Sequence, residues 1–393
     1  MRIAVDATCW QNRRGYGRHA RALLRNLVRL DSGNQYTLFL DAPVGTEPMP
    51  IECAVRMLPS ATPTVEAASA TGRRSLADMW RISRALSSRE FDMLLFPTVY
   101  SYVPTFSPAR KLVMVHDVIA ETYPHLTVPR FSSRLFWNTK VALGRLQADA
   151  WITVSDYSRA GILRRFGMHP DRVFVVGEAA DGVFRKLERP VASAKLRAAG
   201  IQPGGRMAIF LGGFSPHKNL EALVSAFARI AGRAEFSDVT LAMVGDTSSD
   251  AFHTYFGTIA ERVASLGLSN RVIFTGYLDD DDVVALLNLA SVLVLPSLME
   301  GFGLPAVEAA ACGCPVIATK ASPLEGLLGA GGIYIHPTED EIVRALGDIL
   351  SSEERRARMG QLALAAARRL TWDAAAGQMM AVIRQVARQG ASK

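Results

Sequence analysis

Residues 291–313 read SVLVLPSLMEGFGLPAVEAAACG, and this stretch decides the fold class. Residues 292–296 form an unbroken apolar run, which is typical of a strand covered on both faces of a sheet. A glycine-rich turn then leads to Pro305, which favours the first turn of a helix, and Gly313 is expected to end that helix. The stretch therefore predicts a strand, a turn and a helix whose free N-terminal N–H groups attract an anion.

The same alternation of strand and helix patterns continues along the chain. Helical periodicity is clear at residues 18–30, 131–147 and 220–230, and short apolar runs lie between such stretches. Alternation of this kind predicts an α/β protein in which helices cover both faces of two parallel sheets. The predicted strands are residues 2–7, 36–41, 93–97, 111–116, 151–154, 173–176, 207–212, 239–245, 272–276, 291–296, 315–319 and 333–336.

Two series of strands predict two Rossmann-like domains that face a central cleft. The division is expected near residues 189–202, because a new series of strands begins after this segment. We expect an N-terminal domain over residues 1–190 and a C-terminal domain over residues 191–371. Residues 372–393 are expected to form a C-terminal helix that can pack back across the domains.

The composition is that of an ordinary globular protein. Of the 393 residues, 49% are hydrophobic and 21% are charged, which excludes a largely disordered, collagen-like or disulfide-stapled chain. No apolar stretch approaches the roughly 18 residues of a membrane-spanning helix. Asp6 interrupts what would be the apolar run of a signal peptide, so we expect a cytoplasmic protein with reduced cysteines.

Positive charge is concentrated in the first half, where residues 1–190 carry a net charge of +9 while the remainder carries −2. Arg18, Arg21, Arg25 and Arg29 recur at spacings of three and four on a predicted helix, opposite a row of leucines. Either they form a solvated face, or they attract an anionic membrane or a pyrophosphate-bearing acceptor. The membrane interpretation places the protein peripherally on the inner face of a membrane. Nucleic acid is not an expected partner, because the arginines lack interleaved aromatic residues.

A glycine loop near the N-terminus resembles a dinucleotide fingerprint. Gly15, Gly17 and Ala20 fit the pattern G-x-G-x-x-G/A. The first glycine of that fingerprint lies at the end of the strand, whereas about eight residues separate Ala7 from Gly15 here. This spacing disfavours an NAD-dependent oxidoreductase. Two readings remain: glycines that only let a loop turn, or a glycine loop that lines an interdomain cleft.

Two carboxylates flank the helix N-terminus predicted at Pro305. Glu300 comes before the helix, and Glu308 lies about one turn inside it. Carboxylates beside an anion site need other partners, and the hydroxyls of a sugar and a ribose are donors that they can accept from. The alternative is an acid that complements the helix dipole together with a glutamate on the surface.

The run Asp279–Asp282 admits two interpretations. A D-x-D pair could hold Mg²⁺ or Mn²⁺ against a diphosphate. The run also follows a predicted strand and opens a helix, where aspartates cap the helix and complement its dipole. We favour the cap, and we expect neither a metal nor another cofactor.

Glu300-x7-Glu308 within EGFGLPAVEAAACGCPVIAT resembles the signature of the retaining GT-B glycosyltransferases of family 4. Other segments that resemble this family follow in its order, and together they span essentially the whole chain. They are the glycine loop, His116-Asp117 with Tyr123-Pro124 beyond it, ADAWITVSDYSRAGILRRFG and FLGGFSPHKNLEALVSAF. The His116 segment is similar to that of mannosyltransferase-like members, which implies mannose as the transferred sugar.

The resemblance implies a role for each matching residue. Glu308 would bind the donor ribose, Glu300 the sugar hydroxyls, and Lys218 the leaving diphosphate. His116 would face the transferred sugar near its anomeric centre. Many members carry an arginine at the position of Gly213, so neutralisation is expected to rest on Lys218 and the helix at Pro305. The remaining donor-binding positions implied are Gly15, Gly17, Gly213, Gly276, Tyr277, Leu278, Gly301, Phe302, Gly303 and Leu304.

We therefore expect a retaining hexosyltransferase that uses GDP-mannose in preference to UDP-glucose. The acceptor is expected to be a glycan or a lipid-linked glycan in cell-surface polysaccharide or lipopolysaccharide synthesis. Front-face attack is expected, with the departing phosphate taking the proton of the acceptor. The alternatives are a GT-B nucleotide-sugar epimerase, an NAD-dependent oxidoreductase and a non-catalytic nucleotide-sugar binder.

Overall fold

The computed structural model describes residues 1–12, 15–45, 48–58, 60, 64, 75–201, 204–247 and 255–391. The described residues form two compact units. The first consists of Met1–Glu178 and the C-terminal segment that begins at Thr371, and the second lies between Ala179 and Leu370. The division thus falls between Glu178 and Ala179, upstream of the one expected from the sequence, and residues 372–391 group with the first unit.

The first unit is built on a parallel sheet, seven-stranded among the described residues, with the order β3-β2-β1-β4-β5-β6-β7. The chain extends the sheet from β1 to β3 on one side and then returns to place β4 on the other side of β1. The strands are β1 (Arg2–Asp6), β2 (Gln35–Leu40), β3 (Ala54–Met57), β4 (Met93–Phe96), β5 (Arg110–Met114), β6 (Ala150–Thr153) and β7 (Val173–Val175).

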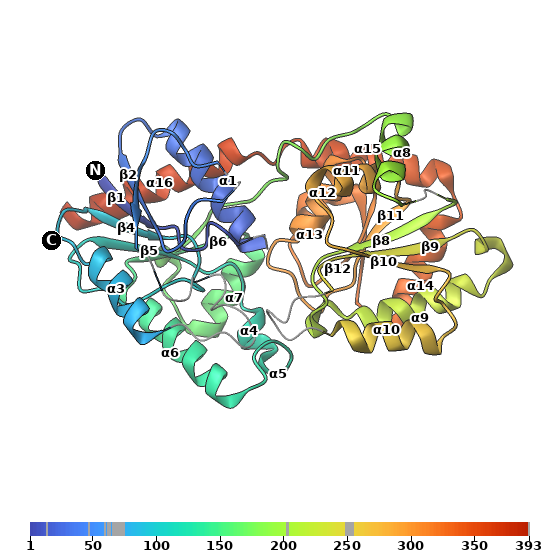
Figure 1. Ribbon diagram of the computed structural model, residues 1–393, viewed down its shortest axis with the longest axis horizontal. Coiled ribbons are helices and arrows are strands. Elements are labelled where there is room, and N and C mark those ends of the chain that lie inside the picture. Colours follow the sequence, from blue (N-terminus) through green and yellow to red (C-terminus); the bar gives the residue numbers. More distant parts are fainter. Residues whose placement is uncertain are drawn as a thin grey trace. The chain divides into compact units, whose positions relative to one another are not determined.

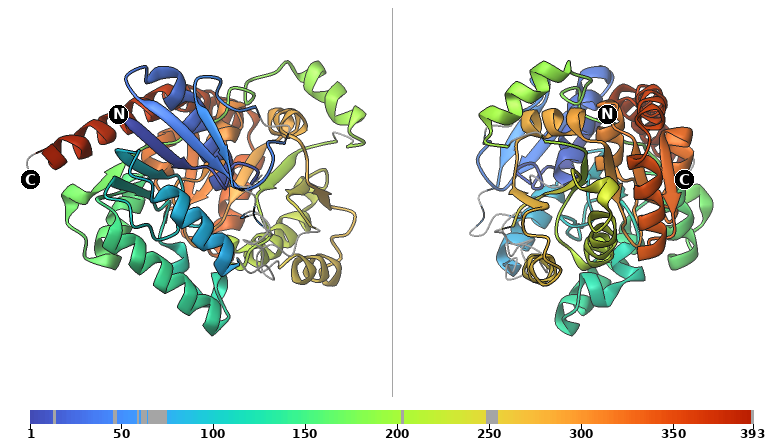
Figure 2. Two further views of the ribbon diagram at one scale, coloured as in Figure 1. Left: turned by 60° about the vertical axis from the view of Figure 1, so that its left-hand side comes forward. Right: turned by 90° about the vertical axis from the view of Figure 1, so that its right-hand side faces the viewer.

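Helices cover both faces of this sheet. α1 (Gly15–Leu30) and α16 (Trp372–Ala391) pack against each other on one face (Figure 1, Figure 2). α3 (Leu76–Leu86), α6 (Phe131–Gln147) and α7 (Asp156–Phe166) lie on the other face (Figure 1). The short helices α4 (Ile119–Thr122) and α5 (Pro124–Thr127) link β5 to α6. The C-terminal helix thus completes the first unit from the far end of the sequence.

The second unit contains a second parallel sheet, six-stranded within the described ranges, with the order β10-β9-β8-β11-β12-β13. Its central strands are unbroken apolar runs, and every residue of β11 and β12 is buried. The strands are β8 (Met207–Leu211), β9 (Thr240–Val244), β10 (Val272–Gly276), β11 (Val292–Leu295), β12 (Val316–Thr319) and β13 (Gly332–Ile335).

Two helical layers enclose the second sheet (Figure 1). One layer contains α9 (Leu220–Ala231), α10 (Phe256–Ser265) and α14 (Glu339–Leu350), because α9 packs against both of the others. α8 packs on α11, and α12 packs on α11, α13 and α15, which forms the other layer. Its members are α8 (Arg189–Ala198), α11 (Asp280–Leu289), α12 (Leu304–Ala311), α13 (Leu324–Leu328) and α15 (Glu353–Ala367).

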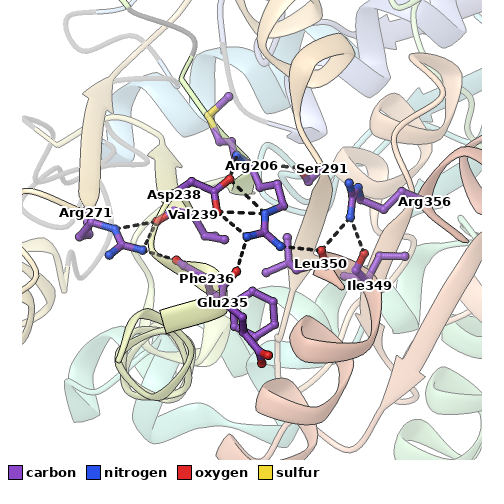
Figure 3. Close-up of polar contacts among 11 residues, drawn as sticks. Arg206, Glu235, Phe236, Asp238, Val239, Arg271, Ser291, Ile349, Leu350 and Arg356 are labelled. Carbon is purple, nitrogen blue, oxygen red and sulfur yellow. Dashed lines mark hydrogen bonds and ion pairs between the residues drawn. The ribbon is translucent and has the colours of Figure 1, made fainter. Parts of the chain in front are cut away.

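Polar contacts between half-buried and exposed side chains hold the amino edge of the second sheet (Figure 3). Arg206, just before β8, pairs with Asp238, just before β9, and its Nη1 donates to the carbonyl of Leu350 at 2.9 Å. Arg356 donates to the same carbonyl, so two guanidinium groups satisfy the C-terminal end of α14. Arg271, just before β10, donates to the carbonyl of Val239 at 2.7 Å. These contacts lie at the amino ends of the strands. The opposite edge, at the carboxyl ends, is where parallel α/β sheets usually bind ligands.

All twelve strands predicted from the sequence are present, and β3 is the one strand in the described chain that was missed. β3 is four residues long and exposed throughout, because it lies at an edge of the first sheet and pairs only with β2. The predicted helix at Pro305 is α12. It begins at Leu304 and ends in a Schellman motif, in which the N–H of Cys314 donates to the carbonyl of Ala309.

Candidate active site

The first set of candidate residues lies in the second unit, where the strand order reverses. β8 and β11 are neighbours in the sheet but not in the sequence, and loops that leave them at the carboxyl edge diverge to opposite sides. Such a switch point is the usual ligand crevice of a parallel α/β sheet. Lys218 follows β8 and Glu300 follows β11, so the two residues lie at this point.

Lys218 and Glu300 form a direct ion pair. The Nζ of Lys218 lies 2.6 Å from Oε1 of Glu300, and Ser297 donates its hydroxyl to the same oxygen at 2.5 Å. The side chains of Lys218 and Glu300 are 18% and 8% exposed. Because Glu300 accepts two hydrogen bonds in this pocket of low exposure, the ammonium of Lys218 is held in one place.

Backbone contacts fix the loop that carries Lys218. Asn219 adopts the left-handed conformation, with φ of 57°, and donates from Nδ2 to the carbonyls of Pro296 and Pro337 at 3.2 and 2.7 Å. The N–H of Leu298 also donates to the carbonyl of His217 at 2.9 Å. The loop after β8 is thereby joined to the loops after β11 and β13. Asparagine tolerates the left-handed region better than most residues, which is the one sequence signal that could have indicated this role.

His217 lies beside the ion pair, a position that the sequence analysis did not include. Burial and the adjacent ammonium of Lys218 lower its pKa to about 4, so the imidazole is neutral at physiological pH. Its Nδ1 is buried and has no hydrogen-bond partner among the described residues. The backbone of His217 thus joins the two loops, while its side chain adds no charge to the site.

The glycine turn after Glu300 leads directly into α12. Gly303 has φ of 87°, and a Cβ on it would lie 2.8 Å from the side chain of Leu324. The N–H of Glu300 donates to the carbonyl of Ala321 at 3.0 Å, which ties the turn to the loop after β12. Gly301, Phe302 and Gly303 are buried, whereas Leu304 at the start of the helix is half-buried. The turn is therefore rigid and presents the N-terminus of α12 at the carboxyl edge.

Glu308 is buried inside α12, only 2% exposed. The alternative of a glutamate on the protein surface is therefore wrong. α12 packs on α11, α13 and α15, and this covers the helix on most sides. A carboxylate is costly to bury unless polar groups satisfy it, so its position inside the helix one turn after Leu304 calls for such partners.

Four more candidate residues lie at the same edge of the second sheet. Gly276 ends β10 with φ of 71°, its carbonyl accepts from the N–H of Gly245 at 3.1 Å, and Tyr277 after it is 57% exposed. Leu278 is half-buried. Gly213, two residues after β8, is exposed, and a Cβ there would have only the hydroxyl of Ser215, 4.0 Å away, as a neighbour. Among the described residues, no other atom outside the two chain neighbours lies within 4 Å of that Cβ.

The second set lies in the first unit, again near a switch point, where β1 and β4 are neighbours. α1 begins at Gly15, and a Cβ on Gly17 would lie 2.1 Å from the carbonyl oxygen of Asn12, so only glycine fits there. Tyr16 stacks on Tyr100, which follows β4, with ring centroids 5.1 Å apart. The loop after β1 thus folds back on its own helix rather than turning tightly at the strand end, unlike a dinucleotide-binding loop.

His116 follows β5 and belongs to a cluster with His19 and Glu178. Its Nε2 lies 3.3 Å from the carbonyl of Pro97, and its Nδ1 lies 3.8 Å from Oε1 of Glu178. His19 approaches the same oxygen at 2.8 Å, and its ring packs edge-on against His116 and Trp372. The sequence analysis missed His19 and Glu178. Two signals pointed to them: His19 lies on the apolar side of its helix, and Glu178 follows a predicted strand.

Electrostatics hold this cluster in a defined charge state. Burial lowers the pKa of His19 below its ordinary value, despite the carboxylate of Glu178 beside it. Burial also opposes ionisation of Glu178, but the nearby His19 and His116 outweigh it and lower the pKa of the Glu178 carboxyl to about 2. Glu178 is therefore a fixed negative charge behind His116.

The same three residues are the one group in the described chain with ligand atoms close enough to hold a metal ion, all within 4.8 Å of one another. Two ligands on a tetrahedral zinc lie about 3.3 Å apart, given bonds of about 2.0–2.1 Å. His19 and Glu178 are closer, at 2.8 Å. The group is therefore arranged as a close cluster of one carboxylate and two imidazoles, and we assign it no metal.

The expectation that Arg21 faces a membrane or acceptor is wrong. Arg21 is buried and donates from Nη1 to the carbonyls of Trp10 and Asn12 at 2.6 and 2.7 Å. These carbonyls need a donor because the loop after β1 folds onto α1. Arg25 donates to the carbonyl of Pro48 and lies over the ring of Trp10, and Arg29 pairs with Asp373 of α16. Arg18 is half-buried, so the four arginines do not form one solvated face.

The aspartate run opens α11 as the capping interpretation predicts. Oδ1 of Asp279 accepts from the N–H of Asp282 at 2.9 Å, and Asp281 pairs with Lys195 of α8 at 2.9 Å. Asp279 is thus engaged as an N-cap. Within the described residues, no helix combines the length and the hydrophobicity that a bilayer crossing requires.

The comparisons with known proteins agree with this geometry. A family model described as "Glycosyltransferase Family 4" matches residues 13–181, and one described as "Glycosyl transferases group 1" matches residues 193–365. The chain is 32% identical over 241 residues to the MMP alpha-(1->4)-mannosyltransferase of Mycolicibacterium hassiacum, a match that covers 60% of this chain and 54% of that protein. The chain spans about half the length of the curated relatives it matches.

Solved structures share the fold over nearly the whole chain. Sucrose-phosphate synthase from Thermosynechococcus elongatus matches with a TM-score of 0.77 and 21% identity, over 98% of this chain and 99% of that one. Anabaena HepE in complex with UDP-glucose matches with a TM-score of 0.72 and 18% identity, over 100% and 99%. Two parallel-sheet units are the GT-B fold, and the two family models follow one another along the chain. The chain belongs to the group 1, family 4 glycosyltransferases.

Proposed function

We propose that the protein transfers a hexose, with retention of configuration, from a nucleotide sugar to a glycan or lipid-linked acceptor. The acceptor would belong to cell-surface polysaccharide or lipopolysaccharide synthesis, and the protein would work in the cytoplasm, peripherally on the inner face of a membrane. The observation that carries the proposal is the Lys218–Glu300 pair beside the N-terminus of α12, at the switch point of the second sheet.

The chemistry of a sugar–phosphate bond explains why this arrangement is useful. Breaking the bond develops negative charge on the departing diphosphate, and fixed positive groups stabilise that charge without reorganising. Lys218 supplies a held ammonium, and α12 supplies free N–H groups and the positive end of its dipole. These groups take the place of a bound divalent cation, so the proposed reaction needs no metal.

Carboxylates give the site its sugar specificity in this proposal. Glu300 would accept from sugar hydroxyls, and the buried Glu308 would accept from the ribose of the donor. The amides from Gly301 to Leu304 would hold the sugar and phosphate, and the turn at Gly276 would contact the base. In the first unit, His116 would face the transferred sugar, with Glu178 as a negative charge that supports the developing positive charge of the ring.

Mannose is the proposed sugar, and glucose is the second candidate. The His116 segment resembles mannosyltransferases, and the relative from Mycolicibacterium hassiacum is named as one. HepE is described in complex with UDP-glucose, which favours a nucleotide sugar but names a different donor. GDP-mannose is therefore tested first and UDP-glucose beside it.

A ligand screen followed by a turnover assay tests the proposal. Thermal unfolding is measured with GDP-mannose, UDP-glucose, GDP, UDP and NADH, because a ligand that binds the native state raises the unfolding temperature. The expected result is stabilisation by one nucleotide and its sugar, and none by NADH. Stabilisation by NADH alone would refute the proposal.

Turnover separates the transferase from its rivals. With the stabilising donor, the wild type should release nucleoside diphosphate faster when a membrane extract of glycan acceptors is added, and Lys218→Met should not. An epimerase would convert the sugar without any acceptor. A non-catalytic binder would bind the donor and release no diphosphate under either condition.

A further inference from the structure

The surface of α6 has an unusual arrangement of apolar side chains. The helix packs on its unit through Val141 and Gly144, which are buried. Phe131, Leu135 and Leu146 are 78%, 59% and 79% exposed. At about 100° per residue, these three fall within roughly 60° of one another and on the side away from Val141 and Gly144. Figure 1 shows α6 at the periphery of the first unit, with no helix or strand on its outer side.

An apolar stripe that faces outward is the reverse of an ordinary surface helix. Amphipathic helices of globular proteins turn their apolar face to the core and their polar face to water. Phe136, beside the stripe, is also 51% exposed. Clustered exposure of large apolar side chains marks a surface that contacts a partner or a membrane.

The charged side chains of α6 itself are all positive. Residues 122–148 contain no aspartate or glutamate, whereas Arg130, Arg134, Lys140 and Arg145 lie in or next to α6. Arg134 donates to the carbonyls of Val128 and Pro129, and Arg145 to that of Phe166. Because a backbone carbonyl carries no net charge, these hydrogen bonds orient each guanidinium group without neutralising it.

Some arginines of the first unit pair with carboxylates. Arg56 pairs with Glu90 and Arg110 with Asp149. In the part of the chain that the structure describes, Arg130, Arg134 and Arg145 have no carboxylate partner. Two arginines of the neighbouring α7, Arg164 and Arg165, are exposed close to the end of α6. Among the described residues, Arg130, Arg134 and Arg145 are thus three positive charges near the stripe without a carboxylate partner, while one acid, Glu121, accepts from Nε1 of Trp137 on α6 at 2.7 Å.

We propose that the outer face of α6 docks on an anionic lipid bilayer, with Phe131, Leu135 and Leu146 in the headgroup region and the arginines on the phosphates. A helix with an apolar face and basic flanks lies in the plane of a membrane interface. A second copy of this chain fits less well, because a two-fold contact through this face would bring like-charged arginines together. The proposal moves membrane contact from α1, where Arg21 is buried, to α6. It rests on the proposed function only for the location at a membrane, and it does not depend on the identity of the donor or the acceptor.

Vesicle sedimentation with paired variants tests the proposal. Vesicles contain phosphatidylcholine alone or phosphatidylcholine with phosphatidylglycerol, at low and high salt. The wild type should bind the anionic vesicles, weakly at high salt, and bind the neutral ones far less. Arg130→Gln with Arg145→Gln should lower the partition constant about 25-fold, at about fivefold per charge near the surface. Phe131→Ser with Leu135→Ser should lower it at least tenfold, since both side chains leave the interface.

Matched controls remove the same groups elsewhere. Arg368→Gln with Arg369→Gln deletes two exposed charges of the second unit, and Ile51→Ser deletes an apolar side chain that is 93% exposed. Both controls should bind like the wild type. Quenching of a Phe131→Trp variant by brominated lipid gives a second measurement that does not need a loss of binding.

Several outcomes would overturn the proposal. They are no binding of anionic vesicles by the wild type, equal losses in the controls, or no quenching of Trp at position 131 on bound vesicles. An apolar variant that turns a dimer into a monomer while vesicle binding is unchanged would assign the face to a second copy instead. Failure of donor binding would leave these results unaffected, so the two proposals fail separately.

Discussion

Lys218→Met removes the ammonium while keeping most of the length of the side chain. The ion pair with Glu300 spans 2.6 Å between two side chains of low exposure. With an effective dielectric constant of about 20, the gross attraction is about 6 kcal/mol. Desolvation of the two ions cancels much of it, and removing one partner leaves the other unbalanced. Because Lys218 retains some exposure, we expect a loss of about 2–3 kcal/mol in the free energy of unfolding, slightly below that of a fully buried pair.

Turnover should fall further than stability. Removing one group that stabilises developing negative charge typically costs about 10²–10³ in kcat, and donor affinity should change less because the charge develops mainly as the bond breaks. The double variant Lys218→Met with Glu300→Gln has no unbalanced charge, so it should recover at least half of the lost stability and none of the turnover. Urea denaturation and initial rates measure the two quantities. A double variant as unstable as the single one, or a folded Lys218→Met with near-normal kcat, would refute this reasoning.

Three further predictions concern charge. Gly213→Arg should raise donor affinity about fivefold or more, because a Cβ at position 213 has only the Ser215 hydroxyl nearby and a guanidinium binds phosphate strongly. Calorimetry with the nucleoside diphosphate measures the affinity, and Gly213→Gln is the uncharged control. The pKa of the Glu178 carboxyl, about 2, lies below its ordinary 4.5, so the stability that the charged carboxylate contributes is complete above pH 4.5 and is lost as the pH falls towards 2. Glu178→Gln should therefore make the free energy of unfolding less dependent on pH between 4.5 and 2. An unchanged pH dependence in this variant would contradict a charged Glu178. Activity should persist in EDTA, and Asp280→Asn with Asp282→Asn should keep it; loss with EDTA that Mn²⁺ restores would reinstate a metal.

The buried strands could be predicted because the apolar run that marks each strand lies within the strand itself. In a parallel sheet both faces are covered, so β11 and β12 are unbroken apolar runs that stand out from their surroundings. β3 lacks that signal because it is only four residues long and Arg56 interrupts its apolar residues. The motif at Glu300 was equally local, since its strand, turn and helix follow one another without a break.

Contacts between distant segments were not predictable in the same way. Arg21 carries the spacing of a solvated helix face, yet two carbonyls of the folded-back loop after β1 draw it inside. Arg29 pairs with Asp373, 344 residues further along the chain. Periodicity describes which side of a helix a residue occupies, but not which other segment comes to cover that side. For the same reason, the sequence periodicity of α6 did not show that the apolar side chains on its outer face are exposed.

Because Gly213 contributes no cationic side chain, the fixed position of the Lys218 loop matters for the proposed reaction. A site with two cationic side chains can tolerate motion in one of them, whereas a site with one must hold it in place. Here Glu300 and the hydrogen bonds of Asn219 to two other loops restrict where the ammonium can lie. A group already fixed in the ground state costs little entropy when charge develops on the leaving diphosphate. We therefore interpret Asn219, with its left-handed backbone, as the residue that lets Lys218 act alone in the proposed reaction, because Gly213 offers no second cationic side chain.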